Sequence, residues 1–187
     1  INVMNPGIIP ATSFTCIQTE SDGDITLKWN QSTNLANSFY AYKLKSLQGL
    51  DITINDISIT SYTIPAINAA HDFFIGVQSG CEGNTVKYSD TLQNIHLALT
   101  NPGNGIAILQ WNVPSSPQTV GMSDYVQIYR QYPVGTFTWV DSVAYGATQF
   151  LDTIDICSAE IGYQIILPNN PCPFTSNKPT DIFEDLI

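Results

Sequence analysis

The sequence predicts an all-β protein built from two seven-stranded β-sandwiches in tandem. First, residues 24–29 and 106–111 both alternate in polarity and end in a tryptophan, Trp29 and Trp111. The two tryptophans are about 80 residues apart, which is the length of one small sandwich domain. Second, each half closes with an apolar strand that runs toward a cysteine, Cys81 or Cys172. Third, no amphipathic segment of helical period exceeds about two turns.

The strands of the first half follow one another within residues 10–93, which we interpret as domain 1. Short runs of alternating polarity, separated by turn residues, predict strands at residues 12–19, 24–30, 38–47, 52–54, 61–64, 72–78 and 86–92. A hairpin turn is predicted at residues 21–24, because Gly23 can adopt a positive φ at no steric cost.

The second half repeats this order within residues 94–187, which we interpret as domain 2. Its predicted strands are residues 95–100, 106–112, 124–132, 136–144, 149–153, 162–167 and 179–186. About two residues separate the last strand of domain 1 from the first strand of domain 2, so we expect a stiff pair. Residues 1–9 are interpreted as a leader or the end of a preceding module.

The charge of the chain is acidic in both halves. It carries 16 Asp and Glu residues against 6 Lys and Arg, a net charge of −10 and a pI near 4.2. This balance argues against binding to nucleic acid. The longest apolar runs have the length of strands, so no membrane insertion is predicted. The chain starts at Ile1, and we expect a segment of a longer protein whose other domains are its partners.

The four cysteines, Cys16, Cys81, Cys157 and Cys172, are predicted to form two disulfides. They show neither C-x-x-C spacing nor neighbouring histidines, so no metal site is predicted. In a seven-stranded sandwich the first strand begins at the pole where the sixth ends, which predicts a Cys16–Cys81 pair. Elimination leaves Cys157 with Cys172, although the strand at residues 163–167 lies between them.

Several of these segments resemble a known family. The tryptophan at the end of the second strand, the run Ile128-Tyr129-Arg130 and the strand at residues 136–141 resemble fibronectin type III domains. The order of seven strands agrees with this family. The resemblance covers about residues 10–187 and implies two immunoglobulin-like sandwiches.

A narrower resemblance rests on residues 150–157, residues 163–165 and Cys172. This pattern is similar to the tandem fibronectin type III-like repeats of large Bacteroidetes surface or secreted proteins, which often precede a gliding-motility-type C-terminal sorting domain. The chain contains no such sorting domain, and its first half has no counterpart of Cys157. The resemblance implies an extracellular or cell-surface location.

The same resemblance implies a modification. Exported proteins of the Bacteroidetes are O-glycosylated at short Asp-Ser/Thr-aliphatic patterns, and three such tripeptides occur here. Their hydroxyl residues are Thr91, Ser142 and Thr153, of which we expect one to be modified.

No residue pattern indicates catalysis. His71 and His96 stand at the edges of predicted strands and belong to no triad or metal-binding motif. Acidic residues that are close in sequence, such as Asp152 and Asp155, are expected to be solvated turn residues rather than glycosidase carboxylates. We therefore expect no enzymatic activity, no cofactor and no metal.

The aromatic residues, 11% of the chain, leave two functions open. Trp29 and Trp111 are expected in the cores. Trp139, on an edge strand, is expected to face outward, and with Tyr132 and Tyr145 it is the candidate ligand contact. We favour a non-catalytic spacer or adhesion segment of an exported bacterial cell-surface protein. The alternative is a module that binds a glycan or a host surface protein through these aromatics.

Overall fold

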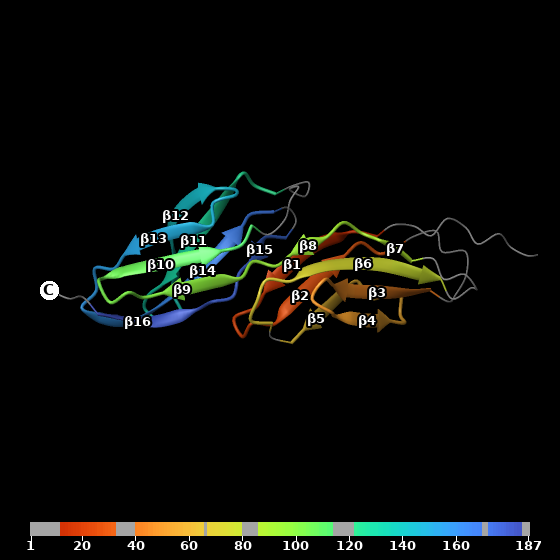
Figure 1. Cartoon of the computed structure of the whole chain (residues 1–187), viewed down its shortest axis with the longest axis horizontal. Helices are drawn as coiled ribbons and strands as arrows, with labels where there is room; N and C mark the ends of the chain where they lie inside the picture. The colour runs from red at the N-terminus through yellow and green to blue at the C-terminus, as the bar shows by residue number, and fades with distance from the viewer. Residues whose placement is uncertain are drawn as a thin grey trace, which may run out of the picture.

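The computed structural model describes residues 12–32, 40–65, 67–79, 86–113, 122–169 and 172–184, and these residues form sixteen β-strands and no helix. Two sandwiches lie end to end along the long axis of the molecule (Figure 1). We call the sandwich of the first eight strands module 1 and that of the last eight module 2. The predicted all-β tandem of sandwiches is confirmed.

Module 1 packs two sheets face to face. One contributes strands in the order β1-β2-β5, namely β1 (Phe14–Thr19), β2 (Ile25–Trp29) and β5 (Ser61–Ile64). The other has the order β4-β3-β6-β7, with β8 also paired to β6. Its strands are β3 (Tyr40–Ser46), β4 (Asp51–Ile54), β6 (Asp72–Ser79), β7 (Val86–Tyr88) and β8 (Leu92–Gln93).

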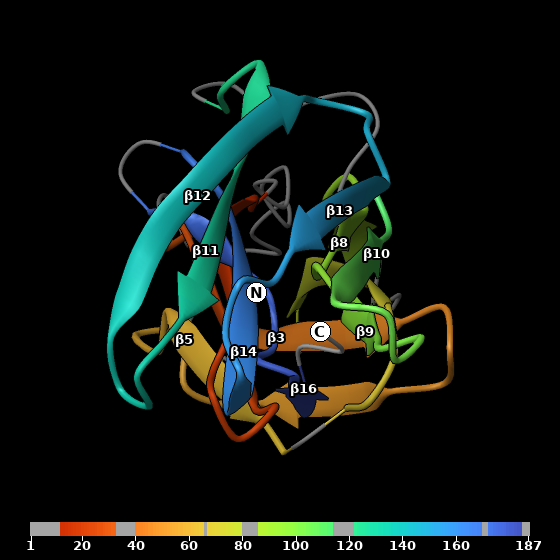
Figure 2. The same ribbon diagram turned by 90° about the vertical axis from the view of Figure 1, so that its left-hand side faces the viewer.

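Module 2 repeats this arrangement (Figure 2). One sheet has the order β13-β10-β9, namely β9 (Leu97–Thr100), β10 (Ile106–Trp111) and β13 (Gln149–Thr153). In the other, β12 pairs with β11 and β11 with β14, while β15 and β16 both pair with β14. Its strands are β11 (Tyr125–Gln131), β12 (Phe137–Ala144), β14 (Ser158–Leu167), β15 (Phe174–Thr175) and β16 (Thr180–Glu184). Both modules therefore have the fibronectin type III-like strand arrangement.

The repeated tryptophans occupy equivalent places in the cores. Trp29 and Trp111, each at the end of a second strand, are only 3% and 6% exposed, as predicted. The ring of Trp29 meets Tyr42 edge-on, with centroids 5.4 Å apart, a favourable geometry for two aromatic rings. Gly23 adopts φ 89°, which confirms the turn predicted between the first two strands.

A serine interrupts the seventh strand of each module. In module 1 the Ser89 N–H donates to the Ile75 carbonyl (2.7 Å), and the Ser89 hydroxyl accepts from the Ile75 N–H (3.1 Å). In module 2 Ser176 makes the same two bonds with Ile165, both of 2.9 Å. The single strand predicted at residues 86–92 is therefore divided into β7 and β8, and β15 is a strand that the sequence pattern did not predict.

Module 2 also contributes a strand to a sheet of module 1. β15 lies between β14, to which it is antiparallel, and β1, to which it is parallel, with Gln18 opposite Thr175. The resulting eight-stranded sheet has the order β12-β11-β14-β15-β1-β2-β5, with β16 beside β14. One hydrogen-bonded sheet thus runs through both modules (Figure 1). The predicted domain boundary between residues 93 and 94 stays a prediction.

Candidate functional site

A disulfide joins the two modules. It links Cys16 of β1 to Cys172, which precedes β15, with 5.5 Å between their Cα atoms and a sequence separation of 156. Cys157 is exposed and unpaired, and Cys81 lies outside the described residues. The predicted pairs Cys16–Cys81 and Cys157–Cys172 are therefore wrong.

The pairing follows from the path of the segment between β14 and β16. This segment leaves its own sandwich and runs beside β1, where the Thr175 hydroxyl donates to the Thr19 carbonyl (3.3 Å). It carries Cys172 to Cys16. Cys157 precedes β14 and Cys172 follows it, so the ten residues of that strand hold the two thiols about 30 Å apart. The prediction assumed that each module pairs its own cysteines.

Asparagine side chains hold the short connection between β8 and β9. Asn94 accepts a hydrogen bond from the His71 N–H through Oδ1 (2.7 Å), which fixes the connection to module 1. Asn112, which follows β10, accepts from the His96 N–H (2.8 Å) and donates to the Asn94 carbonyl (2.9 Å). Backbone groups that would otherwise face water at the junction are therefore paired with side chains.

A third asparagine ties β9 to the segment that carries β15. The Asn177 side chain accepts from the Leu97 N–H (2.7 Å) and donates to the Leu97 carbonyl (2.9 Å). Ile95, only 1% exposed, forms a parallel bridge with Ser176 beside it. The connection is thus held on both sides, which limits rotation of one module against the other.

Both histidines belong to this junction. The ring of His71 stacks on Phe73, with centroids 6.0 Å apart. Burial lowers the pKa of His96, because desolvation disfavours the imidazolium. His71 directly precedes β6 and His96 directly precedes β9, so their predicted positions at strand edges are confirmed.

Asp152 connects the two sheets of module 2, which corrects the prediction that it is a solvated turn residue. Its Oδ2 accepts hydrogen bonds from Arg130 Nη1 (3.0 Å) and from the Tyr163 hydroxyl (2.7 Å). Burial, and then the hydrogen bond to Asp152, raise the pKa of Tyr163, because a phenolate would lie in the core beside a carboxylate. Asp155 is exposed, as predicted.

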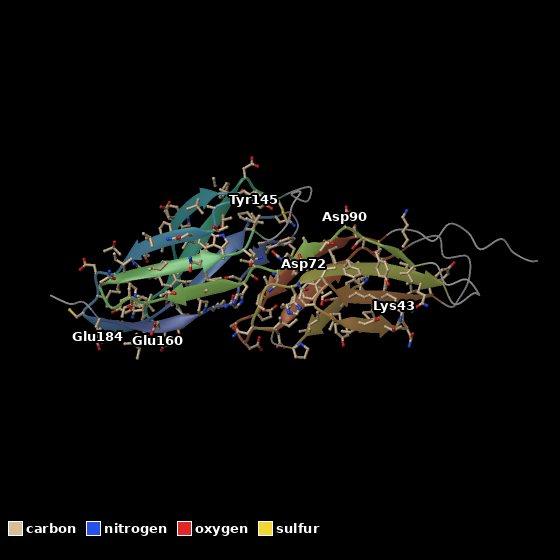
Figure 3. All side chains as sticks on the ribbon, viewed as in Figure 1. Lys43, Asp72, Asp90, Tyr145, Glu160 and Glu184 are labelled. Carbon is tan, nitrogen blue, oxygen red and sulfur yellow. A yellow bond between two sulfur atoms is a disulfide. The ribbon has the colours of Figure 1, made fainter. Side chains whose placement is uncertain are left out.

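The three aromatic residues predicted to bind a ligand do not form one cluster. Trp139 lies on β12 and is 58% exposed, so its predicted outward orientation is confirmed. Tyr132 precedes β12, whereas Tyr145 follows it at the end nearest module 1 (Figure 3). The eight residues of β12 put about 23 Å of extended chain between these two tyrosines. Tyr145 is half-buried against the core.

A β-bulge decides which residues accompany Trp139. The register between β11 and β12 shifts next to Ile128, so that Trp139 stands opposite Tyr129 and Val140 has no partner in the ladder. The extra residue puts Trp139 and Ser142, three positions apart, on one face, where the indole N–H donates to the Ser142 hydroxyl (3.2 Å).

The residues implied as O-glycosylation sites differ in accessibility. Thr91 and Thr153 are exposed, whereas Ser142 is half-buried and accepts the bond from the Trp139 indole. Thr153 follows the buried Asp152, whose carboxylate is already bonded to Arg130. Thr91 is therefore the most open of the three tripeptides.

A metal ion would need several ligating side chains close together in the described residues. No group of three or more His, Cys, Asp and Glu side chains there could hold a metal ion. The Asp22 carboxylate accepts from the Asp24 N–H (3.1 Å) and so belongs to its own turn. The described residues also contain no helix that is long and apolar enough to cross a membrane.

Comparisons with known proteins find distant similarity among solved structures. No protein-family model matches the chain, and no curated protein matches it. Among 354 matching chains of solved structures is a segment of two fibronectin type III domains from chicken tenascin. It is 14% identical, with a TM-score of 0.34, over 91% of this chain and 98% of that one. The FN1–FN3 domains of chicken CNTN1 are 11% identical, with a TM-score of 0.38, over 96% of this chain and 66% of that one. At these scores the strand order remains the basis for the fold.

Proposed function

We propose that this tandem is a non-catalytic, stiff spacer segment of an exported cell-surface protein. The observation that carries the proposal is the Cys16–Cys172 disulfide, which bonds one module covalently to the other. A disulfide inside one sandwich would stabilise that sandwich alone. A disulfide between two sandwiches holds their relative placement, which is what a spacer needs in order to keep neighbouring domains at a fixed separation.

Three features of the junction support stiffness. The sheet continues from β14 through β15 into β1, the connection is pinned by asparagine side chains, and its Ile95 is buried. Bending the pair would break these bonds together with the packing around them. Inter-domain motion is the usual expectation for tandem domains unless the interface is substantial, and here it includes main-chain pairing and a covalent bond.

The exported location is proposed on chemical grounds and on the sequence resemblance. Disulfides persist in oxidising compartments and are rare in the cytosol, where thiols are kept reduced. From the resemblance to Bacteroidetes repeats we further propose a location at a bacterial cell surface, a sorting domain elsewhere in a longer chain, and O-glycosylation at Thr91. Other domains of that longer chain are the proposed partners.

Peptide mapping of intact source cells tests this proposal. Trypsin and a Glu-specific protease together place the four cysteines in four different peptides, because trypsin separates Cys16 and Cys81 from the others and cleavage at Glu160 separates Cys157 from Cys172. Under non-reducing conditions we expect surface-released peptides in which Cys16 is bonded to Cys172. Peptides released only after cell lysis would contradict the exported location, and reduced cysteines would contradict the covalent spacer.

A further inference from the structure

The outer face of module 2 gathers aromatic, amide and hydroxyl side chains over three neighbouring strands. On β11, Gln127 and Tyr129 point outward, since the alternate residues Val126 and Ile128 are buried. On β12 their partners are Ser142 and Trp139. On β14, Gln164 stands opposite Tyr129. We call these five residues the aromatic–amide face.

The side chains of this face are held in place by one another. The Trp139 indole N–H donates to the Ser142 hydroxyl (3.2 Å), and the Tyr129 hydroxyl donates to Gln127 Oε1 (3.3 Å). Each hydrogen bond joins two residues of the same strand, so the Trp139 ring on β12 and the Tyr129 ring on the neighbouring β11 are both held in a fixed orientation. Because the indole N–H is already bonded, Trp139 offers a ligand its ring surface. Preorganised side chains lose little entropy on binding.

The chemistry of this face fits a sugar. One side of a pyranose ring carries axial C–H groups that are weakly positive, and these pack on the negative π-face of tryptophan or tyrosine. Around the ring, vicinal hydroxyls each donate and accept hydrogen bonds. The Gln127 and Gln164 amides also donate and accept, as such a partner requires. An extended sheet face exposes several such groups in a row and suits a linear chain of sugars.

The charge of the face indicates whether a bound glycan would be acidic or neutral. The cross-strand rows that join residues 127–131 to residues 162–166 and 137–142 present no charged side chain on the outer side. The corresponding strand of module 1 differs, because its outward positions include Lys43 and Lys45. Figure 3 shows Lys43 on that module. Lys178 borders these rows at one end, where its Nζ lies 5.1 Å from the centroid of the Phe137 ring. The five residues of the face are themselves uncharged, and the chain charge of −10 disfavours an acidic polymer more than a neutral one.

We propose that the aromatic–amide face binds a neutral polysaccharide, with a sugar ring stacked on Trp139 and Tyr129 and its hydroxyls bonded to Gln127 and Gln164. This inference goes beyond the spacer role and stands independently of it, since a stiff segment can carry the face or lack it. It assigns module 2 an adhesive surface that module 1 does not share.

Affinity electrophoresis of the full chain tests the proposal. The gels contain a mannan, a xylan, a mixed-linkage β-glucan or a dextran, with polygalacturonate as the acidic probe. We expect at least one neutral polymer to retard the wild-type chain. Trp139→Ala and Tyr129→Ala should each weaken that association about tenfold, as the loss of a stacked ring implies. Tyr88→Ala, which removes a partly exposed tyrosine from module 1, is the matched control and should bind as wild type does.

A second readout uses the position of the tryptophans. Trp29 and Trp111 are buried, so iodide should quench the fluorescence of Trp139 selectively, and the retarding polymer should protect it. Circular dichroism of each variant checks that the fold is retained. The proposal is overturned if no neutral polymer retards the chain, if only polygalacturonate does, or if folded Trp139→Ala binds like wild type. Selective binding of a host protein by this face without any glycan would overturn it as well.

Discussion

The disulfide between the modules predicts how the pair responds to tension. When the chain is pulled from its two ends, the load passes from Cys16 to Cys172 through the sulfur–sulfur bond. The residues between these cysteines are bypassed, whether or not they are folded. The oxidised pair should therefore be nearly inextensible, because unfolding inside the loop cannot lengthen the loaded path.

The magnitude follows from the length of the loop. The disulfide spans 156 residues, and an extended chain reaches about 3.3 to 3.6 Å per residue, so the bond hides about 500 to 560 Å of contour length. Breaking the bond exposes this length to the load. Both modules contribute similar numbers of residues, so we expect two unfolding steps of roughly half that length each.

Single-molecule force spectroscopy measures these increments directly. Wild-type protein under oxidising conditions should extend without the long steps, whereas Cys172→Ser, or wild type with a reductant, should show both. Cys157→Ser is the matched control, because it removes a thiol that is not in the disulfide. Cys81→Ser tests the pairing that the sequence alone favours and should also leave the oxidised pair inextensible.

The reasoning would be refuted by long steps in the oxidised wild type, which would mean that the bond does not bridge the modules. It would equally be refuted if Cys81→Ser released the hidden length and Cys172→Ser did not. The second result would assign the disulfide to module 1, and either result would remove the covalent argument for a spacer.

Three further predictions concern stability. Trp111→Ala should cost about 3–5 kcal/mol by leaving a cavity in the core, whereas the exposed Trp139→Ala should change stability by less than about 0.5 kcal/mol; urea denaturation compares them. Asp152→Ala should cost about 2–4 kcal/mol in the same assay, because it leaves the buried Tyr163 hydroxyl and the Arg130 guanidinium without their hydrogen-bond acceptor. The control Asp155→Ala, at an exposed position, should cost little. The raised pKa of Tyr163 favours the protonated phenol in the folded state. Its contribution to stability is therefore complete below the usual tyrosine pKa of about 10 and falls as pH rises above that value. Between pH 8 and 11, the urea midpoint should drop less in Tyr163→Phe than in wild type.

Most strands of the fold could be predicted from local pattern alone. Alternation along β3 and β10 records which side of each strand meets the core, and that information is contained in a few consecutive residues. The tryptophans follow the same rule, because each ends a strand whose alternate residues are buried. Local pattern therefore sufficed for the fold class and for the core.

The junction could not be predicted in this way. β15 is only two residues long, and it is ordered by contacts with β14 in its own module and with β1, whose Gln18 is far away in sequence. The choice of Cys172 as the partner of Cys16 depends on that placement. Cysteine spacing alone is compatible with several pairings, and only the three-dimensional path selects one.

The candidate binding face was predicted in part. The outward orientation of Trp139 follows from its place on an edge strand. Its neighbours Tyr129 and Ser142 depend on the bulge at Val140, which changes the register by one residue and leaves no clear signal in the sequence. The buried position of Asp152 cannot be predicted for a related reason, since its partner Arg130 lies on another strand.

The insertion of β15 between β14 and β1 bears on how such a chain can evolve. Sandwich domains are commonly duplicated and exchanged one at a time, because each has its own hydrophobic core. Here a copy of module 1 alone would add β1 to the sheet edges, such as β5, at which the sheets of the pair already end, and would leave Cys16 without its bonding partner. The unit that can be copied with both cysteines of the disulfide is the pair, so lengthening by duplication would proceed in steps of two modules.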